Sequence, residues 1–70
     1  MKLNTEVLDG VLVIETEEED IKVVIDVPTG EVLFFEHLEV TINRLSSFIA
    51  KAKTRYNKFL NSKAIDDFIQ

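Results

Sequence analysis

The sequence predicts an α+β fold, in which a four-stranded antiparallel β-meander packs against one long C-terminal helix, followed by a short terminal helix. Up to residue 35, short runs of alternating apolar and polar residues are separated by turn-forming residues, as in strands. From residue 38, apolar residues recur at steps of four and three, which places them on one side of a helix. The 70 residues therefore form one domain, with the sheet over 2–35, the long helix over 38–60 and the short helix over 62–69.

The first two strands are predicted on either side of Asp9-Gly10, over residues 2–8 and 11–17. This dipeptide tolerates the positive φ angles that a two-residue type I′ turn requires. With that loop, Val7 lies opposite Leu12 and the apolar side chains of both strands gather on one side of the hairpin.

The third strand is predicted over 21–27, after a charged turn at 17–20, and the fourth begins after Pro28-Thr29-Gly30. These loop lengths place Val23 opposite both Ile14 and Phe35, and Ile25 opposite Leu33. The apolar sides of neighbouring strands coincide, which supports the register. The expected inner face consists of Leu3, Val7, Leu12, Ile14, Ile21, Val23, Ile25, Val27, Leu33 and Phe35.

The long helix is predicted from Leu38, where the helical spacing begins, although alternation of apolar residues up to Ile42 leaves open a start at Asn43. Its apolar stripe consists of Leu38, Ile42, Leu45, Ile49, Ala52, Tyr56 and Phe59, and Phe48 and Leu60 widen it to what a core-facing helix needs. Asn61-Ser62 interrupts the pattern, and Ser62 can cap a short terminal helix.

The same register places apolar side chains on the outer face of the sheet, where a one-sided sheet is polar. We expect an interface there, formed by Val11, Val13, Val24, Val32 and Phe34. A contiguous apolar surface indicates that something covers it. The candidates are a second copy, a different protein, or the chain's own Ile65, Phe68 and Ile69.

The net charge of −5 is unevenly distributed along the chain. Residues 1–43 hold eleven acidic and two basic residues, whereas residues 44–70 hold two acidic and six basic residues. An acidic patch is formed by Glu15, Glu17, Glu18, Glu19 and Asp20, and a basic stripe along the helix by Arg44, Lys51, Arg55 and Lys58. The patch is either a phosphate mimic or a solubilising turn, and the stripe either a nucleic-acid contact or a solvated flank.

The sequence offers little for catalysis, so we expect no enzyme, no cofactor and no metal site. There is no cysteine, His37 is the single histidine, and Gly10 and Gly30 are both needed in turns. No serine lies in a nucleophile motif. The start of the chain has no signal-peptide pattern, and no segment has the length of a membrane span. These features predict a soluble cytoplasmic protein.

The predicted function is non-catalytic protein binding, in which a small acidic protein docks on a larger protein and inhibits or regulates it. In size, charge and lack of chemistry the chain resembles small inhibitors encoded by phages and mobile elements, a likeness of composition that covers no motif. The expected partners are a larger protein and a second copy, with no membrane. The alternative is a nucleic-acid-binding or regulatory homodimer that uses the basic stripe.

Overall fold

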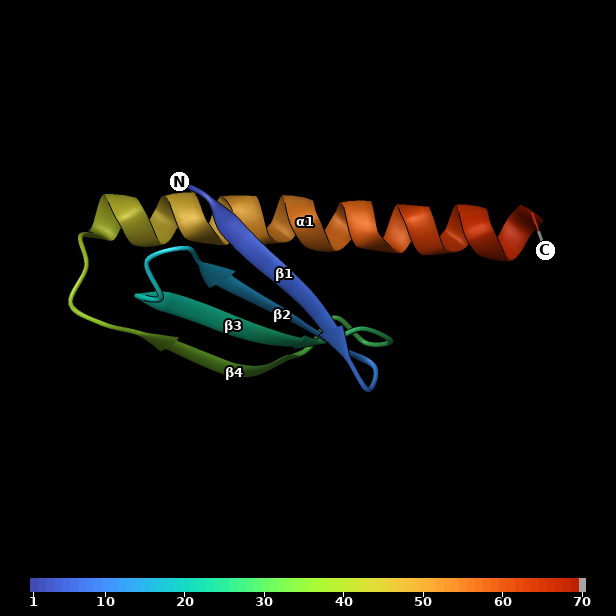
Figure 1. The fold of residues 1–70 in the computed structure, drawn as a ribbon, viewed down its shortest axis with the longest axis horizontal. Coiled ribbons are helices and arrows are strands. Elements are labelled where there is room, and N and C mark those ends of the chain that lie inside the picture. Colours follow the sequence, from blue (N-terminus) through green and yellow to red (C-terminus); the bar gives the residue numbers. More distant parts are fainter. Residues whose placement is uncertain (70) are drawn as a thin grey trace.

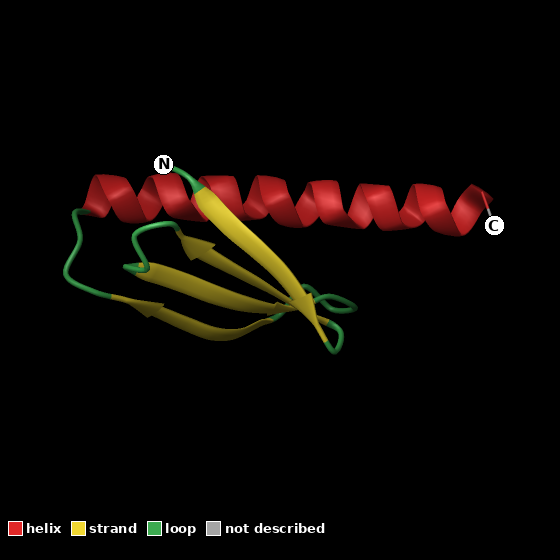
Figure 2. Ribbon diagram, viewed as in Figure 1, coloured by secondary structure: helices red, strands yellow, loops and turns green. Residues whose placement is uncertain are grey.

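The computed structural model describes residues 1–69, with side chains described through Ser62. Four strands follow one another along the chain and in the sheet, in the order β1-β2-β3-β4, and one helix follows them (Figure 1, Figure 2). The elements are β1 (Leu3–Leu8), β2 (Val11–Thr16), β3 (Ile21–Asp26), β4 (Val32–His37) and α1 (Ile42–Ile69). The predicted antiparallel meander packed on a long helix is confirmed.

The first two hairpins have the predicted registers. Asp9 and Gly10 have φ angles of 47° and 81°, as a type I′ turn requires, and Val7 lies opposite Leu12. Between β2 and β3, Ile14 lies opposite Val23 as predicted. Turn chemistry and the coincidence of apolar faces were therefore sufficient to align these three strands.

The predicted register between β3 and β4 is correct at Val23 and wrong near the turn that joins the two strands. Val23 lies opposite Phe35 as predicted, but Ile25 lies opposite Val32 instead of Leu33, with a bulge between the two pairs. The turn begins one residue earlier on β3 than predicted. The Asp26 N–H donates to the Glu31 carbonyl oxygen at 2.8 Å, so Asp26, and not Val27, pairs with Glu31. The bulge absorbs this offset and leaves Leu33 as the extra residue of β4.

The predicted helix start at residue 38 is wrong, because β4 continues through His37 and α1 begins at Ile42. The Leu38 N–H donates to the Asp20 carbonyl oxygen at 2.8 Å, which keeps this segment beside β3. Thr41 is the N-cap, since its hydroxyl oxygen accepts a hydrogen bond from the Arg44 N–H at 3.1 Å.

The predicted break at Asn61-Ser62 is also absent, and α1 runs as one helix to Ile69. Asn and Ser are only about 0.5 kcal/mol worse than Ala in a helix interior, so neither residue ends a helix as Pro does. The side chains of Ile65, Phe68 and Ile69 lie outside the described part of the chain, as does the cover that they were predicted to form.

The core lies between α1 and the β1–β3 part of the sheet, with Phe48 fully buried at its centre. The buried apolar residues are Leu3, Leu12, Ile14, Ile21, Val23, Ile25, Val27, Phe48 and Ala52. Among the strands, β2 makes the main contact with α1, and β4 lies farthest from the helix (Figure 1).

Two residues predicted on the buried face, Leu33 and Phe35, are exposed for this reason, and Val7 on β1 is also exposed. On the helix, Phe48 is buried as expected for a residue that widens the stripe, but Ile42 and Ile49 of the predicted stripe are 81% and 44% exposed, so the buried side is centred nearer Phe48 than predicted. The helix therefore covers one half of the sheet and leaves the half that contains β4 open.

Candidate protein-binding groove

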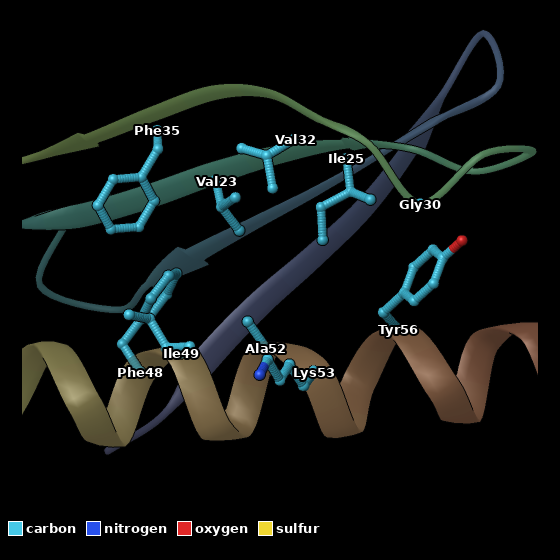
Figure 3. Close-up of a pocket in the computed structure, with 10 residues that line it drawn as sticks. All are labelled: Val23, Ile25, Gly30, Val32, Phe35, Phe48, Ile49, Ala52, Lys53 and Tyr56. Carbon is cyan, nitrogen blue, oxygen red and sulfur yellow. The ribbon is translucent and has the colours of Figure 1, made fainter.

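An apolar groove of about 400 Å³ lies between α1 and the uncovered half of the sheet (Figure 3). Side chains of β3 and β4 point toward the helix from one side, and helix side chains point toward them from the other. The lining residues are Val23, Ile25, Gly30, Val32, Phe35, Phe48, Ile49, Ala52, Lys53 and Tyr56. We call this the β4 groove.

The dimensions of the elements explain why the β4 groove exists. Four strands at about 4.8 Å spacing make a sheet about 19 Å wide, whereas a helix with its side chains is about 10–12 Å across. One helix therefore covers about half of such a sheet. Since α1 packs mainly on β2, the vacant half lies over β3 and β4.

One end of the β4 groove is closed by Tyr56, whose hydroxyl donates to the Val27 carbonyl oxygen at 2.8 Å. Gly30 lies against this side chain with a φ of 76°, and a Cβ there would be 3.1 Å from the Tyr56 hydroxyl oxygen. Both the positive φ and the close approach favour glycine. Lys53 is the one charged residue among the described residues that line the β4 groove.

The surface around the β4 groove is unusually apolar. Ten large apolar side chains are exposed in the described residues, and six of them lie on β4, on the connection that follows it, or on the groove side of α1. These six are Val32, Leu33, Phe34, Phe35, Leu38 and Ile49, of which Phe34 lies on the outer face of the sheet. Such a concentration is typical of a surface that contacts another molecule.

The outer face carries part of the predicted interface. Val13, Val24 and Phe34 form a row across β2, β3 and β4, as the predicted register requires. Val11, Val13 and Val24 are half-buried and Phe34 is 46% exposed. Val32 was placed on this face and does not lie there, because the bulge puts it opposite Ile25, on the side of the helix.

The acidic patch is partly engaged within the molecule. The Arg44 guanidinium donates to Asp20 at 2.7 Å and to Glu18 at 2.9 Å. Hydrogen bonds from Arg44 and from the Thr16 hydroxyl lower the pKa of Asp20 from 3.8 to about 2. These contacts attach the turn to the first part of α1. Glu15 is half-buried, and Glu17 and Glu19 are exposed.

Thr16 is the polar residue at the centre of this turn, and it is fully buried. Its hydroxyl donates to Asp20 and accepts hydrogen bonds from the N–H groups of Asp20 and Ile21, at 3.0 and 3.2 Å. This uses the donor and both acceptor positions of the hydroxyl. The sequence analysis did not single out Thr16, although a threonine before an acidic turn is a known turn-forming residue.

Three members of the basic stripe contact other parts of the same chain. Arg44 contacts the acidic turn, the Lys51 ammonium donates to the Met1 carbonyl oxygen at 3.1 Å, and Arg55 donates to the Thr5 hydroxyl oxygen at 3.2 Å. Lys58 is exposed. The stripe therefore fastens α1 to β1 and to the turn before β3.

Within the described residues, no group of three or more histidine and carboxylate side chains is arranged to hold a metal ion. The one helix among these residues is not apolar enough along its length to cross a membrane. Comparison with protein-family models, with curated proteins and with solved structures finds no match to this chain.

Proposed function

We propose that the protein is a non-catalytic binding module that docks on a larger protein and regulates it, with the β4 groove as its binding surface. The occupant that we propose is an amphipathic helix of the partner. The supporting observation is the half-covered sheet, because the vacant part has the width of one helix and is lined by apolar side chains.

The chemistry of the lining restricts the occupant further. Phe35, Val32 and Ile49 favour an apolar stripe on the partner helix, since each is exposed and would be removed from water. Lys53 beside them favours an acidic residue at the edge of that stripe, because an ammonium group at the border of an apolar contact is better neutralised than left unpaired.

Two exposed isoleucines of α1 provide a matched test. Ile49→Glu places a carboxylate in the β4 groove, whereas Ile42→Glu makes the same change outside it, at the first residue of the helix. Tagged wild-type and variant proteins are used to capture partners from lysate, followed by quantitative mass spectrometry. We expect one set of proteins to be retained by wild type and Ile42→Glu and lost with Ile49→Glu.

The captured protein is then purified and its affinity measured by calorimetry. We expect Ile49→Glu to raise the Kd at least tenfold, which is about 1.4 kcal/mol, and Ile42→Glu to leave it unchanged. Equal binding of the Ile49→Glu variant would contradict the proposal, as would equal losses in both variants.

A further inference from the structure

We propose that the β4 edge pairs with the β4 edge of a second copy of this chain, antiparallel and about a twofold axis through Phe35. The two four-stranded sheets then join into one. β4 is the last strand in the order β1-β2-β3-β4, so one of its sides has no neighbouring strand within the described residues. This inference goes beyond the proposed function, because it depends on the backbone of the strand edge and not on the β4 groove.

The hydrogen bonds around β4 identify which backbone groups are free. The Leu38 N–H donates to the Asp20 carbonyl oxygen, so it points toward β3. Successive residues of a strand point their backbone groups to alternate sides, so the N–H groups of Glu36 and Phe34 also point toward β3. Phe35 and His37 therefore present their N–H and C=O groups at the open edge.

A twofold axis through Phe35 matches these free groups with one another. Phe35 lies opposite Phe35 of the second copy, and His37 lies opposite Leu33, the extra residue of the bulge, whose backbone is not held in the ladder with β3. The bulge lies at the start of β4, so the strand from Phe34 to His37 is regular and available for pairing.

The charges of the strand favour this axis over its nearest alternative. An axis through Glu36 would also bring free backbone groups together, but it would place two Glu36 carboxylates directly opposite each other, which is destabilising. With the axis at Phe35, Glu36 lies opposite Phe34 of the second copy. Leu38 then lies opposite Val32, and these two side chains are 62% and 57% exposed in the single chain.

The edge has few of the features that usually prevent such pairing. Exposed edge strands are commonly protected by lysine, by proline or by a bulge. β4 contains neither lysine nor proline, its bulge lies at Leu33 near its start, and it carries four consecutive apolar residues, Val32 to Phe35. A second copy is the partner that fits, because the pattern of free groups, apolar residues and charges is complementary to itself under the twofold rotation.

A substitution that changes only the free N–H provides the test. His37→Pro removes the N–H that points away from β3 and keeps the bonds within the sheet, a position that an edge strand tolerates. His37→Ala removes the same side chain and keeps the N–H. Size-exclusion chromatography with light scattering, over about 1 μM to 1 mM, should show dimers for wild type and His37→Ala, and a Kd raised at least tenfold for His37→Pro. Circular dichroism checks that each variant is folded.

Amide hydrogen exchange of the wild type provides a second test that needs no variant. The amides of Phe35 and His37 should become protected as the protein concentration rises, whereas those of Phe34 and Glu36 should be protected at every concentration. A protein that stays monomeric at 1 mM would overturn the inference. So would a dimer that His37→Pro leaves unchanged, or exchange at Phe35 and His37 that does not depend on concentration.

The two proposals fail separately. His37→Pro should still capture the partner of the β4 groove, and Ile49→Glu should still form the dimer. A wild-type protein that captures the partner but stays monomeric, or whose dimer is unchanged by His37→Pro, would exclude the strand pairing alone. Loss of the partner in both isoleucine variants, with the dimer intact, would exclude the groove alone.

Discussion

β1 and β4 are the two edge strands of the same sheet, and they differ in their contacts with α1. At the β1 edge Leu3 is buried, Arg55 of the helix contacts Thr5, and Lys51 contacts Met1. The other five residues of β1 are exposed, whereas at the β4 edge every residue of the strand is exposed, including two phenylalanines, and none of them bonds the helix in the described residues. Both strands have six residues, so length does not explain the difference.

The difference follows from where the helix crosses the sheet. Two long basic side chains of α1 extend toward this edge, where Arg55 donates to the Thr5 hydroxyl of β1 and Lys51 donates to the Met1 carbonyl oxygen just before the strand, which gives that edge polar contacts with the helix. The C-terminal part of the same helix extends beyond the sheet, and β4 receives no cover from it (Figure 1). This apolar and uncovered edge is the part of the molecule where we propose contacts with other chains.

The largest expected effect is a loss in the free energy of unfolding. Its size should differ between the half of the core that the helix covers and the half that it leaves open. Phe48→Ala should lower the free energy of unfolding by about 3–5 kcal/mol, because Phe48 is fully buried. Phe35, whose ring centre is 6.4 Å from that of Phe48, is 42% exposed, so Phe35→Ala should lower it by less than half as much. Urea denaturation at low protein concentration measures both. Equal losses would mean that the open half is buried in solution.

An intermediate effect is expected at the turn that fastens the covered half to α1. Thr16→Val leaves the buried N–H of Ile21 without its acceptor and should lower the free energy of unfolding by about 1–3 kcal/mol. Thr29→Val is the matched control, because Thr29 also bonds an aspartate, Asp26, but is exposed and should change stability by less than about 0.5 kcal/mol. Thermal unfolding of both variants makes the comparison, and equal shifts would contradict the assigned role of the buried hydroxyl.

The smallest expected effect is a change in stability that appears only at acidic pH. Folding lowers the pKa of Asp20 from 3.8 to about 2, so its contribution to stability is present above pH 3.8 and is lost as the pH falls toward 2. Asp20→Asn should therefore flatten the fall in stability within this range. Glu19→Gln, an exposed neighbour, should leave the profile unchanged. Identical acid profiles for wild type and Asp20→Asn would show that Arg44 does not hold this carboxylate in solution.

Much of the sheet could be predicted because strand pairing depends on local features. The Asp9-Gly10 turn and the alternation of apolar residues aligned β1, β2 and β3 correctly. Prediction failed at Leu33, where a one-residue difference in turn closure moved Val32 to the helix side of the sheet. A shift of one residue reverses the face of a side chain, so small errors in a turn have large effects on the predicted surface.

The candidate site could not be predicted in the same way. The sequence analysis placed the interface on the outer face, and the row of Val13, Val24 and Phe34 is present there. It missed the β4 groove, because the apolar residues that line the groove were assumed to be covered by the helix. Val32 to Phe35 are apolar at every position, and such a run cannot distinguish a covered strand from an open one.

The sequence by itself determined the strands, the turns and the helical character of the C-terminal part, since these depend on the backbone preferences and spacing of nearby residues. Only the tertiary structure decided between the two helix starts that the sequence left open, in favour of the later one, and decided the exposure of Ile49 beside the buried Phe48 and the exposure of β4. These depend on how two apolar surfaces fit together. One helix is too narrow to cover four strands, and the shapes of the packed side chains decide which strand is left open.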